Sequence, residues 1–364
     1  SIMKSYSFIF LALICFNNLT AQFNRTNSKK SNAYRSDYFR MVAGGLHNLE
    51  IREGRLWAWG KNDKGQLGDG TRVDKNTPIQ IGTDQNWISA ATSGFHSLGL
   101  KSDGTLWAWG SNSDGQLGNG SKIDTSKPIQ IGSAKNWISI SAGLIHSHGI
   151  KSDGTLWAWG DNFDGQLGDG TTIDRTSPVQ IGTSTNWTGI AAGLFHTCGL
   201  KSDGTLWTWG WNTEGQLGDG TYWDKYSPVQ ITSAQNWVSI TCGNFHTLGI
   251  KSDGTLWAWG LNSYGQVGDG TYINKNIPIQ ISSAQNWVNI EGGSMHTLGI
   301  KSDGTLWAWG SNNQGQLGDG SLISKNIPNQ IGTSQNWVSI STGIYHTLGL
   351  KSDGTLWAWG DNQY

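Results

Sequence analysis

A ten-residue segment, Lys-Ser-Asp-Gly-Thr-Leu-Trp-Ala-Trp-Gly, recurs through this chain at intervals of fifty residues. Unchanged copies start at Lys101, Lys151, Lys251, Lys301 and Lys351, and altered copies start at Lys201 and end at Gly60. Self-similarity at a fixed period of this size is typical of propellers, solenoids and other repeat arrays. The repeat therefore constrains the fold more strongly than any other feature of the sequence.

Each repeat carries further markers in a fixed order. Trp-x-Trp-Gly is followed by Gly-Gln-Leu-Gly, a proline, an Asn-Trp pair and a histidine. The prolines are Pro78, Pro128, Pro178, Pro228, Pro278 and Pro328. The histidines are His47, His96, His146, His196, His246, His296 and His346. Because all seven histidines share one repeat position, we expect structural hydrogen bonding rather than catalysis, which needs distinct roles.

Four short segments of each repeat have the composition of β-strands. We name them a (Pro-Ile-Gln-Ile-Gly), b (Asn-Trp-Ile-Ser-Ile), c (His-Thr-Leu-Gly-Ile) and d (Thr-Leu-Trp-Ala-Trp-Gly). Lys-Ser-Asp-Gly predicts a tight c–d hairpin with positive φ at glycine, and the polar residues between a and b predict a second hairpin. No sustained 3.6-residue period indicates a helix. The sequence therefore predicts an all-β, seven-bladed propeller with four antiparallel strands per blade.

The chain's 22 tryptophans fit this architecture. In strand d, Leu106 and Ala108 face one side and Trp107 and Trp109 face the other. Neighbouring blades can cover both faces, so we expect the tryptophans to pack between blades, each burying about 200 Å².

The strand count is uneven. Strands b, c and d occur seven times and strand a six times, and Tyr38 stands where other repeats have tryptophan. This predicts a first blade without strand a and a chain truncated at its C-terminus. The closing strand, lying beyond Tyr364, would pair beside residues 38–43, since natural sheets avoid open edges.

The first residues have the features of an export signal. Lys4 precedes the apolar run Phe-Ile-Phe-Leu-Ala-Leu-Ile-Cys-Phe, and Ala21 offers a small residue before cleavage. We interpret residues 1–21 as a signal peptide, 22–36 as a polar linker and 37–364 as the propeller, with no membrane span. A lipoprotein signal at Cys15 is the less favoured alternative. The predicted location is secreted, periplasmic or cell-surface, where a Cys198–Cys242 disulfide is permitted but not required.

Composition and motifs argue against several functions. The net charge of −1 gives no basic face for nucleic acid. Gly-Gln-Leu-Gly-Asp-Gly lacks the Lys-Ser/Thr of a phosphate loop, and no Ser/His/Asp set or carboxylate pair stands out. Asn112, Asp114 and Asn119 lack the spacing and closing Glu of an EF-hand, so we read this loop and the aspartates in it as turn residues. We predict no enzyme activity, catalytic residue, cofactor or metal.

Taken together, these markers form the motif Ser-x-Gly-x-x-His-Thr-Leu-x-Leu-Lys-x-Asp-Gly-x-Leu-Trp-x-Trp-Gly-x-Asn-x-x-Gly-Gln-Leu-Gly-x-Gly, followed by Pro. Over residues 38–364 this motif resembles the regulator of chromosome condensation repeat family. The resemblance implies a seven-bladed β-propeller. The name-giving eukaryotic member is a nuclear guanine-nucleotide exchange factor bound to nucleosomes. A secreted bacterial member, the type II β-lactamase inhibitor protein, uses a similar propeller as a protein-binding surface.

We expect function where the repeats differ. The a–b and c–d turns share one nearly invariant rim, and the b–c turn and d–a connection share the other, which varies. That variable rim also carries Phe163 and Tyr345. The candidate binding residues on it are Trp211, Trp223, Tyr222, Tyr226, Tyr264, Tyr272, Phe195 and Phe245, with Trp211 and Trp223 expected to be exposed.

The sequence favours a secreted, monomeric binding or scaffold protein that holds a protein or a glycan. The alternatives are a guanine-nucleotide exchange or other regulatory activity, which the family resemblance implies, and a structural envelope or adhesion role. Aromatic side chains suit both protein and glycan ligands, so the type of partner stays open.

Overall fold

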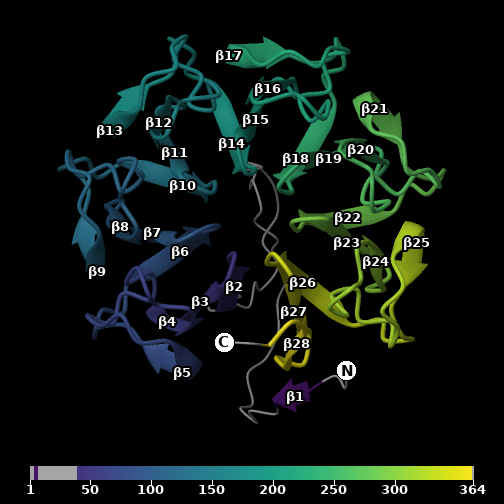
Figure 1. Cartoon of the computed structure of the whole chain (residues 1–364), viewed down its shortest axis with the longest axis horizontal. Helices are drawn as coiled ribbons and strands as arrows, with labels where there is room; N and C mark the ends of the chain where they lie inside the picture. The colour runs from purple at the N-terminus through teal and green to yellow at the C-terminus, as the bar shows by residue number, and fades with distance from the viewer. Residues whose placement is uncertain (1–3, 7–38, 363–364) are drawn as a thin grey trace, which may run out of the picture.

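The protein is a ring of seven antiparallel β-sheets (Figure 1), in a computed structural model that describes residues 4–6 and 39–362. The described residues contain strands, turns and bends but no helix. Accordingly, no helix of this part of the chain is long and apolar enough to cross a membrane. Each sheet is one blade, so the predicted seven-bladed propeller is confirmed.

Within each blade the strands run outward in sequence order, from the centre of the ring to its periphery (Figure 1). Blade 1 consists of β2 (Phe39–Ala43), β3 (His47–Arg52), β4 (Arg55–Gly60) and β5 (Lys75–Gln80). Blade 2 consists of β6 (Trp87–Thr92), β7 (His96–Lys101), β8 (Leu106–Gly110) and β9 (Thr125–Gln130). Blade 3 consists of β10 (Trp137–Ala142), β11 (His146–Lys151), β12 (Leu156–Gly160) and β13 (Arg175–Gln180).

The later blades repeat this pattern. Blade 4 consists of β14 (Trp187–Ala192), β15 (His196–Lys201), β16 (Leu206–Gly210) and β17 (Lys225–Gln230). Blade 5 consists of β18 (Trp237–Cys242), β19 (His246–Lys251), β20 (Leu256–Gly260) and β21 (Lys275–Gln280). Blade 6 consists of β22 (Trp287–Gly292), β23 (His296–Lys301), β24 (Leu306–Gly310) and β25 (Lys325–Gln330). Blade 7 consists of β26 (Trp337–Thr342), β27 (His346–Lys351) and β28 (Leu356–Gly360).

The pairing of strand a differs from the prediction. Strand a pairs with strand d of the preceding repeat, as in the register Trp107↔Gln130, and not with strand b across a hairpin. The d–a connection can fold back on its own blade because its glycines adopt positive φ, as Gly115 and Gly118 do. The short a–b segment therefore links one blade to the next.

This pairing moves the incomplete blade from the start of the ring to its end. Blade 1 has all four strands, so the prediction that it lacks one is wrong, whereas blade 7 has three of its own. The position that a fourth strand would take in this sheet lies beside β28 rather than beside β2. There, β1 (Lys4–Tyr6) pairs antiparallel with β28, with Ser5 opposite Trp357.

The prolines all lie in the outermost strand of a blade, for example Pro128 in β9 and Pro228 in β17. An edge strand tolerates proline because its outward N–H groups have no sheet partner to lose.

Tryptophans join the blades, as predicted. Trp259 of blade 5 is fully buried in the core of blade 4, beside Leu200 and Leu206. Its indole Nε1 donates to the main-chain oxygen of Gln216, 2.9 Å away in blade 4. The same bond recurs from Trp109 to Gln66 and from Trp309 to Gln266.

The tryptophan of strand b explains a glycine in strand c. A Cβ atom on Gly249 would lie 2.6 Å from the ring of Trp237, so only glycine leaves room for the indole. In blade 1 the sequence has Tyr38 and Glu50 at the two corresponding positions, and Tyr38 lies outside the described residues. Buried Glu50 accepts two hydrogen bonds from Arg52, which compensate its charge.

Candidate functional site

The seven repeated histidines form a hydrogen-bonded ring between blades. Six of them are buried and His346 is half-buried, and the Nε2 atom of each lies against a side chain of the next blade, as in the 2.9 Å contact of His246 with Thr297. The Thr297 hydroxyl donates its proton to the main-chain oxygen of Gln266, so it accepts from the histidine Nε2–H. At the join of the last and first blades, His346 meets Asn48 Oδ1 at 2.8 Å. The predicted hydrogen bonding of these histidines is confirmed.

The extra histidine, His148, is different. It is fully buried in β11, and neither ring nitrogen reaches hydrogen-bond geometry with any described residue, although the main chain of Gln166 and Leu167 lies nearby. Five other repeats have leucine at this position: Leu49, Leu98, Leu248, Leu298 and Leu348. Burial lowers the pKa of His148 to about 3, which keeps the ring neutral.

We expect His148→Leu to raise the free energy of unfolding by about 1–3 kcal/mol at neutral pH, because it removes an unpartnered buried polar group. The pKa of His148 in the folded protein lies below the unfolded value of 6.5, so wild-type stability falls as the pH drops below 6.5 and the unfolded chain takes up a proton. The advantage of the variant should therefore grow between about pH 7.5 and about pH 5 in urea titrations. As a control, His246→Leu should be destabilising. A destabilised His148→Leu would contradict this account.

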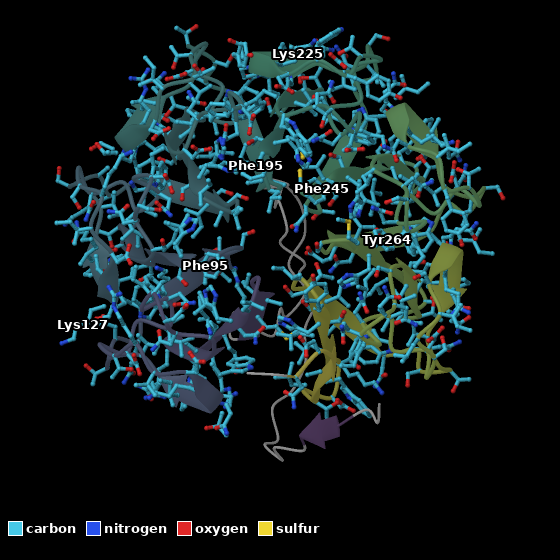
Figure 2. All side chains as sticks on the ribbon, viewed as in Figure 1. Phe95, Lys127, Phe195, Lys225, Phe245 and Tyr264 are labelled. Carbon is cyan, nitrogen blue, oxygen red and sulfur yellow. The ribbon has the colours of Figure 1, made fainter. Side chains whose placement is uncertain are left out.

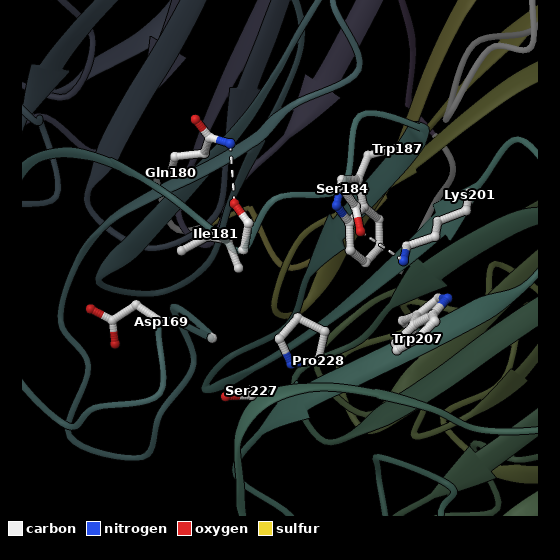
Figure 3. Close-up of a pocket in the computed structure, with 11 residues that line it drawn as sticks. Asp169, Gln180, Ile181, Ser184, Trp187, Lys201, Trp207, Ser227 and Pro228 are labelled. Carbon is white, nitrogen blue, oxygen red and sulfur yellow. Dashed lines mark hydrogen bonds between the residues drawn. The ribbon is translucent and has the colours of Figure 1, made fainter.

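A cavity of about 330 Å³ opens between blades 3 and 4 (Figure 3). Its polar groups are already engaged: Gln180 Nε2 donates to the oxygen of Gly182 at 3.1 Å, and Lys201 Nζ donates to Ser184 at 3.1 Å. The Lys201 ammonium also lies 4.0 Å from the ring centre of Trp207, a cation–π contact. Equivalent lysines lie 3.6 Å and 3.8 Å from their tryptophans in blades 3 and 5. We conclude that these contacts belong to the repeated scaffold.

Three aspartates of neighbouring blades converge on the variable rim. Carboxylate oxygens of Asp114, Asp161 and Asp174 lie within 4.8 Å of one another, and Lys122 Nζ lies 3.0 Å from Asp174. Burial and the neighbouring acids raise the pKa of Asp161 to about 6. The calcium-loop pattern in the sequence lies instead within a single d–a connection. There, Asn112 Nδ2 donates to Asn119 Oδ1 at 3.1 Å, so this pair is internal to the turn.

The aspartates of the d–a connections are turn residues, as expected. Asp169 Oδ1 accepts the main-chain N–H of Thr171 at 2.9 Å, and Arg175 pairs with the same carboxylate. These local bonds lower the pKa of Asp169 against the effect of burial, which alone would raise it.

Three of the eight candidate binding residues form an aromatic cluster: Phe195, Trp211 and Phe245. The Trp211 ring lies 6.2 Å from Phe195 in its own blade and 5.5 Å from Phe245 in the next, both in edge-to-face arrangements. Figure 2 places Phe195 and Phe245 near the centre of the ring. All three side chains are half-buried. The prediction of an exposed Trp211 is therefore wrong, because the two phenylalanines cover part of its surface.

The other five candidates lie apart from the aromatic cluster. Tyr222, Trp223, Tyr226, Tyr264 and Tyr272 are all exposed, and Trp223 has 77% of its surface accessible, as predicted. Within the described part of the chain none of these five rings stacks on another ring. The Tyr226 ring lies against Gly165 of blade 3, so it also covers the connection of the neighbouring blade.

The structure adds exposed apolar residues that a search for aromatic side chains misses. The repeat position of Trp223 holds an exposed apolar side chain in every other blade that has a d–a connection: Val73, Ile123, Ile173, Ile273 and Ile323. Phe163 and Tyr345, which the sequence analysis also placed on this rim, are exposed, as is Phe95 of blade 2. Exposure at this position is thus a property of the repeat, which alignment of the six connections could have shown. Blade 4 differs from the other blades only in having a larger side chain, Trp223, at this position.

The search for similar proteins agrees with the architecture. The model of the RCC1-like domain matches residues 17–282 and 137–364. A Protein RCC2 homolog from Xenopus laevis is 43% identical over 67 residues, which is 17% of this chain and 13% of that protein. The chain thus matches a small part of this curated relative.

Solved structures share the whole fold. Human WBSCR16 has a TM-score of 0.76 at 20% identity, with 91% of this chain and 88% of that chain covered. Prp20p from Saccharomyces cerevisiae, described with its binding to Gsp1p and histones, has a TM-score of 0.74 at 23% identity, covering 88% and 81%. At such identities the likeness concerns the fold. The family model, however, covers most of the chain, and the chain belongs to the RCC1-like domain family.

Proposed function

We propose that this protein is a binding protein that holds a protein partner on the variable rim of blades 4 and 5. The observation that carries the proposal is the aromatic cluster of Phe195, Trp211 and Phe245, which spans the two blades. Half-buried aromatic rings held by their neighbours are typical anchors of protein interfaces, because they offer large contact area with little loss of side-chain freedom.

Comparison between repeats sets this cluster apart from the scaffold. The position of Trp211 is polar in five other blades, where it is Lys61, Ser111, Asp161, Ser311 and Asp361, and it is apolar again in blade 5 as Leu261. The backbone around it does not differ: Trp211 N donates to Phe195 O at 2.9 Å, as Ser111 N does to Phe95 O. The indole is therefore not needed for the fold of the turn.

A protein fits this surface better than a glycan does. Sugars stack on open, flat ring faces, whereas the rings of the cluster meet edge to face at 90° and 67° and shield one another. The binding of Prp20p to Gsp1p and histones gives a precedent for protein recognition by a propeller of this fold.

The test replaces two rim tryptophans of blade 4 by the residues that other blades have at the same repeat positions. We expect a Trp211→Ser, Trp223→Ile variant to fold normally, because serine and isoleucine occupy these positions in other blades. Its affinity for partners captured from the source culture, and then purified, should fall by about tenfold to a hundredfold, as for a loss of interface anchors. Titration calorimetry with the purified partner measures this change.

A matched control removes an exposed apolar side chain far from the cluster: Ile123→Ser in blade 2 should leave the affinity unchanged. A glycan array probed in parallel distinguishes the two ligand classes. Binding to glycans alone, or a partner whose affinity is the same for wild type and the double variant, would refute the proposed surface. Capture of no partner at all would favour a structural role.

We also propose that the chain is exported, on the strength of the pattern in residues 1–21. Cleavage after this segment would remove Lys4–Tyr6, the strand β1 that pairs with β28. N-terminal sequencing of the protein from its native host distinguishes the two states. An N-terminus near residue 22 supports export with cleavage, and one that retains residues 4–6 contradicts it.

A further inference from the structure

Two cysteines meet across the interface between blades 4 and 5. Cys198 lies in β15 and Cys242 ends β18, and their Sγ atoms are 2.8 Å apart. Both side chains are buried, and no other cysteine lies in the described residues. Non-bonded heavy atoms usually keep about 3.5–4.0 Å between them. The two sulfur atoms are therefore closer than ordinary packing places them.

The repeat provides an internal reference for this contact. At the other blade interfaces the same two positions hold different residues, such as Leu98 with Ala142 between blades 2 and 3. Between blades 7 and 1 they hold Leu348 and Ala43. A large apolar residue beside a small one thus satisfies the scaffold without sulfur. Both partners of one contact have changed to cysteine, and these are the pair that touch.

The backbone around each cysteine is regular and fixes its position. Cys198 is paired with Ala191 and Thr208 in its sheet, and Cys242 with Thr247. A disulfide bond is about 2.05 Å long, so the sulfur atoms need to approach by less than about 1 Å. A small side-chain rotation on each strand can supply this movement.

We propose that Cys198 and Cys242 form a disulfide bond that joins blades 4 and 5 covalently. The oxidant is a disulfide-bearing molecule, and the bond forms as the blades assemble, before their interface closes. The Cys242 thiolate attacks the oxidant disulfide, which releases one thiol and leaves a mixed disulfide on Cys242. Cys198 then attacks Cys242 Sγ and releases the second thiol. Two electrons pass to the oxidant, and its two thiols carry away the two protons.

Once the two strands lie side by side, but before the interface closes to the oxidant, their contacts favour Cys242 as the attacking thiol. Burial alone would raise its pKa, but the contacts with Cys198 and with His196 lower it, whereas burial raises the pKa of Cys198. Cys242 also keeps a little accessible surface, and Cys198 has none. The bond would lie close to the aromatic cluster, since Cys198 follows Phe195 by three residues and Cys242 precedes Phe245 by three residues. The proposal itself does not depend on any binding activity.

The experiment compares full-length protein that has been unfolded in urea with its thiols reduced and then refolded in oxidised or in reduced glutathione, because the bond forms before the interface closes. After unfolding and alkylation with iodoacetamide, peptide mapping should show Cys198 linked to Cys242 in the oxidised sample and both alkylated in the reduced one. Closing the loop between them should raise the midpoint of thermal unfolding by about 5 °C. A Cys198→Leu, Cys242→Ala variant carries the residues of the blade 2–3 interface and should fold.

The melting temperature of this double variant should be the same in both glutathione conditions. Two alkylated cysteines in the oxidised wild type would overturn the proposal. A linkage of either cysteine to glutathione alone, or to Cys15, would also overturn it. An equal shift of melting temperature in wild type and variant would show that the effect of glutathione is not due to this bond.

Discussion

Replacing Trp259 by alanine should lower the free energy of unfolding by about 3–5 kcal/mol, the cost typical of truncating a large buried side chain. Trp259 is fully buried, and it packs on Leu200 and Leu206 of the neighbouring blade. The substitution leaves a cavity between two blades and removes the bond from Nε1 to Gln216. The Gln216 oxygen keeps its bond from Thr247 at 2.8 Å, so most of the loss comes from packing.

The control is the same substitution at an exposed tryptophan of the same fold. Trp223→Ala should change the free energy of unfolding by less than about 0.5 kcal/mol, because most of its side chain is already in water. Urea titrations followed by far-UV circular dichroism measure both variants. If Trp259→Ala were no less stable than Trp223→Ala, the interpretation of the repeated indoles as inter-blade packing would be wrong.

Gly204→Ala should destabilise the protein by about 3–5 kcal/mol, through two effects that add. Gly204 has φ +76°, in the left-handed region that costs an alanine about 1–2 kcal/mol. A Cβ atom there would also overlap the main-chain oxygen of Gln235, which the c–d hairpin approaches closely. Since backbone cannot rotate away as a side chain does, the overlap forces the two blades apart.

Gly354 separates these two effects. It occupies the same position in the last hairpin, with φ +82°, but no described atom lies within 4 Å of the place its Cβ would take. Gly354→Ala should therefore cost about 1–2 kcal/mol, the strain alone. The difference between the two urea midpoints measures the contact between blades. Equal losses in both variants would mean that the contact at Gln235 contributes nothing.

The fold could be predicted from the sequence because the same turn, strand and core residues recur in every repeat. The positive φ of Gly204, the edge position of Pro228 and the burial of Trp259 follow from turn chemistry, strand chemistry and hydrophobicity. The pairing of strand a could not be decided in this way. Two neighbours, strand b and the preceding strand d, are each joined to it by a polar connection, and only the hydrogen-bond register shows which one it pairs with.

The sequence placed the candidate residues on one rim, but it did not show which of them contact one another. The rim and its aromatic residues follow from strand direction and from differences between repeats, which the sequence contains. The half-burial of Trp211 depends on Phe195 and on Phe245 of the next blade, and such contacts between blades have no signal in the sequence. Cys198 and Cys242 illustrate the same limit. They stand at different repeat positions, and only the stagger of adjacent blades brings them together.

Hydroxyl-radical footprinting of the protein with and without its captured partner tests the central claim most directly, because it reports the exposure of individual aromatic side chains. The account predicts that Trp211, Phe245 and Trp223 lose reactivity in the complex, whereas exposed Phe163 on blade 3 and Phe95 on blade 2 keep theirs. Unchanged reactivity at Trp211 and Phe245, with protection elsewhere on the ring, would contradict it. The departures from the repeat on blades 4 and 5 would then not form the binding surface.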